Sequence, residues 1–122
     1  MRIAVCDYSP STAASIRDMI DHYCALYEIK NCSIRCIHTP GELLSCEERF
    51  EIVFMGFGGG GGFDAARQLR ERDRSCRIIL VDDTQEYAIR GVRLHCTDFI
   101  LRPVEFRHVV QSMHLAVGGG AG

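Results

Sequence analysis

The sequence lacks several features that would place it in a special class of protein. It has no apolar run of the about 18 to 20 residues that a membrane-spanning helix needs, and no apolar core of a signal peptide near its N-terminus. The 16 acidic residues nearly balance the 14 Lys and Arg residues, so no excess of positive charge indicates binding to nucleic acid or to an anionic membrane. These absences favour a cytoplasmic protein that does not contact a membrane.

The cysteines also lack the pattern of a disulfide framework. The chain has seven of them, an odd number, and no two form a CxxC pair. Disulfide-rich secreted domains usually have an even count and a loop-rich chain, so reduced and partly buried thiols are expected here. Cys32, Cys36 and His38 are residue types that bind zinc, but they share one expected strand and have no second ligand pair nearby. No metal site is therefore predicted.

Short apolar runs alternate with amphipathic segments along almost the whole chain. With 122 residues, 47% of them hydrophobic, the chain has room for one domain and one core. Helix-start signals follow the first two apolar runs, namely Ser9-Pro10 and the capping box of Thr39 and Glu42. Strands are expected at 2–6, 32–38, 51–55, 77–81 and 97–101, and helices at 9–27, 39–49, 63–72, 84–95 and 104–117.

This alternation predicts an α/β fold: a (βα)5, doubly wound, parallel five-stranded sheet in a flavodoxin-like three-layer sandwich. The near-continuous apolar character of the strands agrees with this fold, because parallel strands are usually covered by helices on both faces. Residues 1–117 are expected to form the domain, and the Gly-rich residues 118–122 a flexible tail.

In such a fold, a site is expected beyond the carboxyl ends of the strands. The loops share that edge of the sheet, and helix N-termini point toward it. Carboxylates and a guanidinium follow the strands there, a combination suited to a divalent cation and a phosphate. The residues in question are Asp7 and Tyr8 after the first strand, Gly56 after the third, Asp82 and Asp83 after the fourth, and Arg102 and Pro103 after the fifth.

Six glycines occupy the seven positions 56–62, between the third strand and the next helix. Gly56, Gly58 and Gly61 match the GxGxxG pattern of dinucleotide-binding units, but a run of glycines satisfies almost any glycine motif. The run also follows the third strand instead of the first, and no Gly-Lys-Ser/Thr of a Walker loop comes after it. We expect a mobile loop, because such a run is costly to order.

Three stretches carry a more specific pattern: "MRIAVCDYSP" at the first strand, "FEIVFM" at the third, and "EYAIRGVRLHCTDFILRPVEFRHVVQSM" from the fourth helix to the fifth. They resemble response-regulator receiver (CheY-like) domains, of the kind that precedes LytTR-type DNA-binding domains. The similarity runs from residue 1 to about residue 117. It implies a non-enzymatic role in two-component phosphorelay signalling and transcription regulation, with DNA contacted only through a domain absent from this chain.

The resemblance also implies that the phosphorylation site is degenerate. Asp7 matches the first acid of the family's metal-binding pair, but Tyr8 replaces the second. Gly56 stands at the phosphoacceptor position and has no side chain to phosphorylate. Asp82 replaces the hydroxyl residue that contacts the phosphoryl group, and Arg102 replaces the lysine that pairs with it.

These replacements predict a phosphorylation-independent pseudo-receiver. Phosphoryl transfer needs a carboxylate nucleophile and a Mg²⁺ ion held by carboxylates, so no cofactor is expected and Mg²⁺ binding should be weak or absent. Arg102 should instead pair with Asp7 or Asp82. The retained Pro103 implies a cis peptide bond before it.

Two other functions remain open. Asp82 or Asp83 could accept a phosphoryl group, although either could equally cap the fourth helix. Backbone N–H groups of the glycine loop could bind a small anion or a nucleotide. Tyr8 has two alternatives as well, because it either covers the sheet edge or fills the emptied acidic pocket.

The resemblance places protein contacts on the fourth helix, fifth strand and fifth helix. A protein partner or a second copy of the chain would bind there, and a sensor histidine kinase is a further candidate partner. Phe99 matches the family's switch aromatic. The surface would present Tyr87, Arg90, Arg93, Glu105 and His108.

Overall fold

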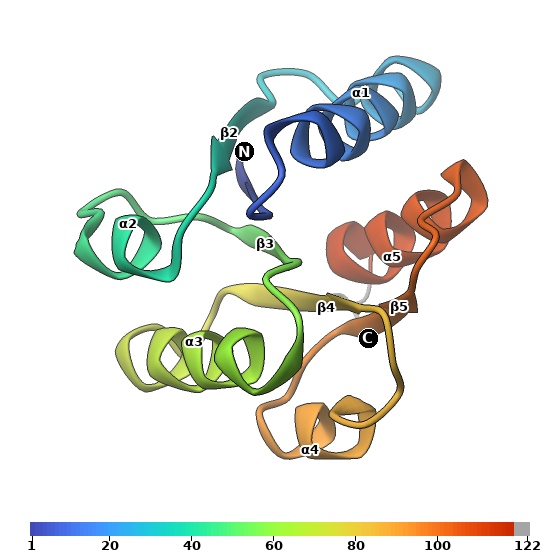
Figure 1. Cartoon of the computed structure of the whole chain (residues 1–122). Coiled ribbons are helices and arrows are strands. Elements are labelled where there is room, and N and C mark those ends of the chain that lie inside the picture. Colours follow the sequence, from blue (N-terminus) through green and yellow to red (C-terminus); the bar gives the residue numbers. More distant parts are fainter. Residues whose placement is uncertain (119–122) are drawn as a thin grey trace.

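The computed structural model describes residues 1–118 and shows one parallel five-stranded sheet between two layers of helices (Figure 1). The strand order is β2-β1-β3-β4-β5, so the predicted (βα)5 fold is confirmed. Of the predicted tail, residues 119–122 lie outside the described part of the chain. The elements are β1 Arg2–Cys6, α1 Pro10–Leu26, β2 Ser33–Ile37, α2 Pro40–Ser45, β3 Ile52–Met55, α3 Gly59–Arg72, β4 Arg77–Asp82, α4 Ala88–Arg93, β5 Asp98–Leu101 and α5 Phe106–Gly118.

The sheet is buried on both faces, as its continuous apolar strands predict. Ile3 and Val5 of β1 pack in a cluster with α1 and α5, whereas Ala4 and Cys6 face a second cluster that includes α2 and α3. Figure 1 shows the same division, with α1 and α5 on one side of the sheet and α2, α3 and α4 on the other. Alternate side chains of one strand therefore build two separate cores.

The first two helices begin as predicted. The Ser9 hydroxyl accepts a hydrogen bond from the Thr12 N–H (3.3 Å), and the Thr39 hydroxyl accepts one from the Glu42 N–H (3.1 Å). The Glu42 carboxylate in turn accepts the His38 N–H at 2.8 Å. Both N-termini thus use side chains close in sequence to satisfy their free N–H groups.

Three helix boundaries predicted from the sequence were wrong by four residues, and the others differ by no more than two. Helix α2 ends at Ser45 instead of continuing to residue 49. At this end, the Arg72 guanidinium of α3 donates a hydrogen bond to the Leu44 carbonyl (2.7 Å), so this carbonyl is satisfied from another helix. Helix α4 begins at Ala88 instead of residue 84, because residues 84–86 turn locally, with the Thr84 hydroxyl accepting the Glu86 N–H (3.4 Å).

The third correction concerns the glycine run, which is not a loop throughout. Residues 59–62 form the first turn of α3, and the Gly62 N–H donates to the Gly58 carbonyl at 2.9 Å. The chain enters this turn with positive φ at Gly58 (+76°) and Gly59 (+61°), a conformation that glycine adopts without steric cost. Only residues 56–58 connect β3 to the helix.

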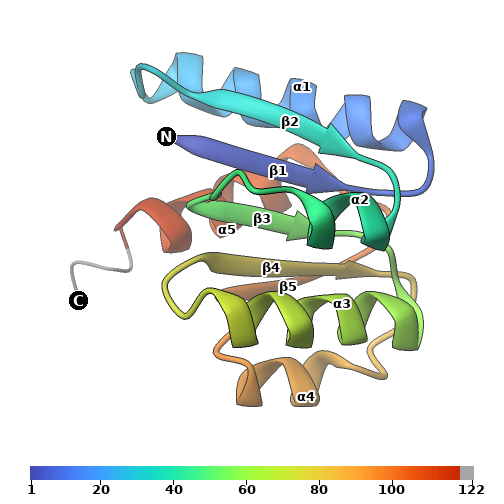
Figure 2. The ribbon, with the colours of Figure 1, turned by 90° about the vertical axis from the view of Figure 1, so that its left-hand side faces the viewer.

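All five strands point the same way, so their carboxyl ends and the connections to the helices share one edge (Figure 2). β1 and β3 are neighbours at the point where the strand order reverses, the usual ligand position in this class of sheet. We call this the carboxyl edge. Across residues 1–118, no helix has the length and apolar character that crossing a membrane would require.

Candidate functional site

Arg102 is the centre of the contacts at the carboxyl edge. It follows β5, and its peptide bond to Pro103 is cis, as predicted. Its Nη2 atom donates to the Asp7 carboxylate (2.5 Å) and to the Gly56 carbonyl (2.8 Å). Asp7 is buried, and only 19% of the Arg102 side chain is exposed. The predicted Arg102–Asp7 ion pair is therefore confirmed, and it joins the connections that follow β1, β3 and β5.

Gly56, directly after β3, has no room for a side chain. A Cβ atom built there would lie 2.6 Å from the Cys6 carbonyl oxygen and 3.0 Å from Arg102 Nη2. The Gly56 N–H also donates to the same Cys6 carbonyl at 2.7 Å, which holds the two backbones close together. The Arg102 guanidinium thus fills the space into which a side chain at position 56 would extend.

Asp82 ends β4 and is buried, with 8% of its surface exposed. Its Oδ2 atom accepts the N–H of Gly59 (2.9 Å), and its Oδ1 atom accepts the N–H of Asp83 (2.6 Å). The suggestion that Asp82 or Asp83 caps α4 is wrong, because α4 begins after Tyr87 without a side-chain cap. Asp82 instead caps α3, where its negative charge meets the positive end of the helix dipole.

Asp83 differs from Asp82 in its exposure. Its side chain is 77% exposed, and its Oδ1 atom lies 4.0 Å from Arg102 Nη1. Such a distant and solvent-screened pair holds neither partner firmly. Asp83 is therefore the accessible carboxylate of the two.

Tyr8 lies on the outside of the carboxyl edge. It is 56% exposed, and its ring packs against Phe57 with the ring centroids 5.0 Å apart. Of the two alternatives for this residue, the structure supports the cover over the edge, because the space beside Asp7 is taken by Arg102.

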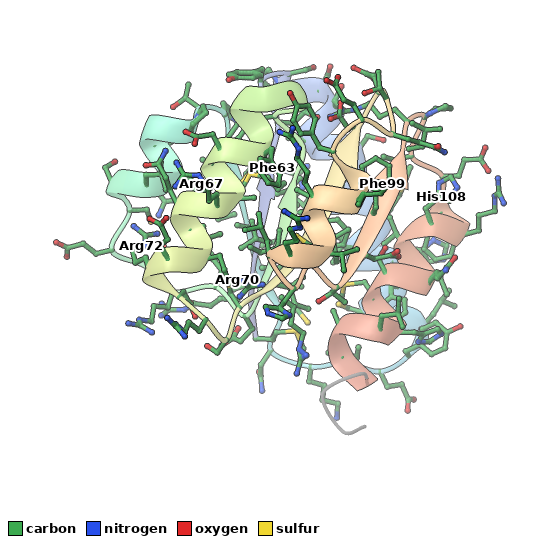
Figure 3. All side chains as sticks on the ribbon, turned by 90° about the horizontal axis from the view of Figure 1, so that it is seen from below. Phe63, Arg67, Arg70, Arg72, Phe99 and His108 are labelled. Atoms are coloured by element: carbon green, nitrogen blue, oxygen red, sulfur yellow. The ribbon has the colours of Figure 1, made fainter. Side chains whose placement is uncertain are left out.

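Phe99 lies within β5, two residues before the strand ends at the carboxyl edge. It packs partly buried against the α3 side of the core and lines a small pocket together with Phe63 and Tyr87. The rings of Phe63 and Tyr87 stack, with centroids 5.5 Å apart and an interplanar angle of 21°. Figure 3 shows Phe63 on α3 facing α4, and Phe99 between α4 and α5.

The five residues predicted to form a partner surface divide into two groups. Arg90, Arg93 and Glu105 are exposed, whereas Tyr87 and His108 are half-buried and engaged within the domain. Tyr87 stacks on Phe63 as described, and His108 Nδ1 accepts the Glu105 N–H at 3.0 Å. The first group projects more of its surface to solvent, although the Glu105 carboxylate accepts a hydrogen bond from Arg107 (2.8 Å) and Arg90 lies over the Tyr87 ring.

Sequence reasoning missed two apolar residues on the same surface. Ile89 and Val92 of α4 are 80% and 71% exposed. They are three positions apart on a helix, the spacing usually found on a buried face, so the pattern alone would have placed them in the core. The buried residue of α4 is Gly91, which has no side chain and so lets α4 lie close to Leu80 of the sheet.

Comparisons with known proteins agree with this architecture. No family model matches the chain. A 67-residue stretch, 53% of this chain, is 27% identical to the sensory transduction protein LytR of Staphylococcus epidermidis, and it spans only 27% of that protein's length.

Solved structures cover nearly the whole chain. The response regulatory domain of mrkE from Klebsiella pneumoniae has a TM-score of 0.82 with this chain at 12% identity. The match covers 98% of this chain and 97% of that one. A CheY-like receiver domain protein from Methanospirillum hungatei has a TM-score of 0.77 at 16% identity and covers 99% and 98%. The chain has the receiver fold. The response regulator DrrB of Thermotoga maritima matches at a TM-score of 0.79 and 15% identity, over 98% of this chain but 53% of its own.

The receiver fold implies a Mg²⁺ ion at the carboxyl edge, and the side chains present do not fit one. Asp7 is paired with Arg102, both oxygens of Asp82 accept backbone N–H groups, and Tyr8 offers no carboxylate. Within residues 1–118, no three His, Cys, Asp or Glu side chains are grouped so that they could hold a metal ion. Mg²⁺ prefers several oxygen ligands in octahedral geometry, which this edge does not supply.

Proposed function

We propose that this chain is a receiver-type signalling domain that works without phosphorylation and acts through protein–protein contacts on an attached or separate transcription-regulating domain. The observation that carries the proposal is the Arg102 guanidinium, bound to Asp7 and to the Gly56 carbonyl in the space that a side chain at position 56 would occupy. The likeness to receiver structures supports the signalling role. DNA would be reached only through another domain.

The chemistry of phosphoryl transfer supports this reading of the edge. The reaction needs a nucleophilic oxygen, a metal ion and a cation that stabilises the developing charge. Gly56 supplies no oxygen nucleophile, and the cation Arg102 is already neutralised by Asp7 at 2.5 Å. Position 56 therefore lacks the nucleophile, and the cation is committed to an internal contact.

Two other functions, phosphorylation of Asp82 and anion binding by the glycine run, lose support because of the hydrogen bonds that Asp82 accepts. The Asp82 carboxylate is buried and accepts two backbone N–H groups, so it is not presented to a phosphoryl donor. The same carboxylate takes the Gly59 N–H that an external anion would need. Asp83 is the one carboxylate among these that is exposed, and the experiment below tests it directly.

The surface that we propose for partners is α4 with the neighbouring edge strand β5. Ile89 and Val92 expose apolar area there, Leu101 of β5 is 39% exposed, and Arg90 and Arg93 surround them with positive charge. An apolar centre with a charged rim is the usual composition of a protein interface. The partner would be a second copy of this chain, a regulatory protein or a sensor histidine kinase bound without phosphoryl transfer.

Intact-mass measurement after incubation with Mg²⁺ and acetyl phosphate tests the proposal. We expect no stable gain of a phosphoryl group in the wild-type chain. A gain that disappears in Asp83→Asn would overturn the proposal and identify Asp83 as the acceptor. A gain retained in Asp83→Asn but lost in Asp82→Asn would assign it to Asp82 instead.

Thermal unfolding separates the anion-binding alternative. A ligand that binds only the folded state raises the melting temperature, and the rise grows with the logarithm of the ligand concentration once this exceeds Kd. We expect Mg²⁺, beryllium fluoride and ATP to leave the melting temperature of this chain unchanged at millimolar concentration. A concentration-dependent rise with any of them would favour a ligand-binding domain over a domain that works by protein contact.

A further inference from the structure

Two cysteine sulfurs lie in contact at the end of the molecule opposite the carboxyl edge. Cys24 is in the last turn of α1, and Cys32 directly precedes β2. Their Sγ atoms are 3.2 Å apart, and both are free thiols. A disulfide bond is about 2.0 Å long, so joining them requires only a short movement of the two side chains.

The two thiols differ in their surroundings. Cys24 is buried, with 7% of its surface exposed, whereas Cys32 is half-buried. Burial, together with the hydrogen bond that the Cys24 thiol donates to the Cys32 sulfur, raises the pKa of Cys24 to about 12. Cys24 therefore keeps its proton, which points at the Cys32 sulfur. Because Cys32 is the more exposed of the two, an oxidant in solution reaches its sulfur first.

The segment between them is already folded back. The backbone reverses direction through residues 27–31, where Glu28 and Asn31 have positive φ values of 53° and 62°. The Ile29 N–H donates to the Cys24 carbonyl at 2.9 Å, which fixes the turn against the end of α1. The two cysteines are therefore held together by the fold before any bond forms.

We propose that Cys24 and Cys32 are a redox modification site, which a peroxide converts to an intramolecular disulfide and a dithiol reduces again. The Cys32 sulfur attacks hydrogen peroxide, the O–O bond breaks, and Cys32 becomes a sulfenic acid as one water leaves. The Cys24 sulfur then attacks the Cys32 sulfur, the S–O bond breaks, and a second water carries away the Cys24 proton. Two thiols lose two electrons and two protons, and one peroxide becomes two waters.

The bond would fix the end of α1 to the start of β2. That end of α1 also contacts α5, because the Tyr23 hydroxyl and His114 Nδ1 are 2.8 Å apart. Closing a short loop removes conformations from the unfolded chain, so oxidation should raise the melting temperature by roughly 5 to 10 °C. The proposal does not depend on the function of the carboxyl edge.

The position of Lys30 allows a direct test. It is the only lysine in the chain and lies between the two cysteines. The protein is treated with hydrogen peroxide and then denatured, its remaining thiols are alkylated in the denaturant so that buried ones such as Cys6 also react, and it is cut with a protease specific for lysine. The fragments 1–30 and 31–122 should stay joined until a reductant is added. Before alkylation, the mass of the oxidised protein should be lower by two hydrogen atoms. Alkylation should then modify five thiols instead of seven.

Three variants assign the bond. Cys24→Ser and Cys32→Ser should each release the two fragments without reductant. Cys46→Ser is the matched control, because Cys46 is also half-buried but its sulfur contacts Arg35 (3.6 Å), and its fragments should stay joined. Cys32→Ser suffices if the buried Cys24→Ser does not fold. Fragments that separate after oxidation of the wild-type chain, or that stay joined in Cys32→Ser, would overturn the proposal.

Discussion

The connections that follow β1 and β3 leave neighbouring strands at the same edge, yet they are stabilised in different ways. After β1, the Asp7 carboxylate accepts the Ser9 N–H (2.9 Å), and Ser9 caps α1 through Thr12. After β3, the chain supplies no cap of its own. Helix α3 is capped by Asp82 of β4, and the Gly56 carbonyl is bound by Arg102 after β5.

The difference shows that a helix start can be specified locally or from a distance. The hydrogen bonds that start α1 come from within the β1 connection itself, although its Asp7 also pairs with Arg102 after β5. The β3 connection is almost bare of side chains and depends on two strands that come later in the chain. Its conformation is therefore a property of the assembled sheet, and substitutions in the two connections should have different costs.

The largest effect is expected for Gly56→Ala, at the start of the β3 connection. The added Cβ would lie 2.6 Å from the Cys6 carbonyl, so the backbones of β1 and β3 would have to separate. We expect the free energy of unfolding, measured by urea denaturation, to fall by about 3 kcal/mol.

Gly61→Ala is the control for this substitution, in the same glycine run. A Cβ there meets nothing within 4 Å, and alanine favours the helix, so a gain of about 0.5 to 1 kcal/mol is expected. Equal losses at both positions would show that the run is not divided between a tight connection and a helical turn.

A smaller loss is expected for Asp82→Ala, which removes the distant cap. The Gly59 and Asp83 N–H groups would lose a charged acceptor, so unfolding should become easier by about 2 kcal/mol. Hydrogen exchange at the Gly59 amide should accelerate at the same time. Asp83→Ala, at an exposed neighbour, should change stability by no more than about 0.5 kcal/mol. Equal losses in the free energy of unfolding for Asp82→Ala and Asp83→Ala would show that Asp82 does not act as a cap for α3.

The smallest loss is expected for Ser9→Ala, which removes the local cap of α1. Loss of a single N-cap hydroxyl costs about 1 kcal/mol. Because Asp7 and Pro10 still direct the chain into α1, helix content by circular dichroism should not change. Ser15→Ala, at an exposed site inside the same helix, should cause no loss. A larger loss at Ser9 than at Asp82 would reverse the proposed division between the connections.

The fold was predictable because its signals are local. Ser9, Thr39 and the apolar strand runs act over a few residues, and each confirmed element rests on such a signal. The errors have the opposite cause. The end of α2 depends on Arg72 of another helix, and the start of α3 depends on Asp82 of another strand. Arg72 and Asp82 lie outside the helices whose ends they bind, so the sequence of each helix alone does not reveal them.

The candidate site was predictable in its members but less so in its contacts. Strand ends collect at one edge in this fold, which brought Asp7 and Arg102 together as expected. The choice of Asp7 over Asp82 as the partner of Arg102 depends on side-chain geometry. The exposure of Ile89 and Val92 depends on how closely Gly91 lets α4 approach the sheet, and no spacing in the sequence encodes that distance.

The Arg102–Asp7 pair has a further consequence for how the carboxyl edge responds to its surroundings. Added salt screens exposed charges strongly but reaches a mostly buried pair such as this one much less. Both partners belong to the same chain, so dilution does not separate them either. Ionic strength and protein concentration should therefore leave this edge unchanged, which makes it a fixed part of the framework rather than a sensor of the solution around it.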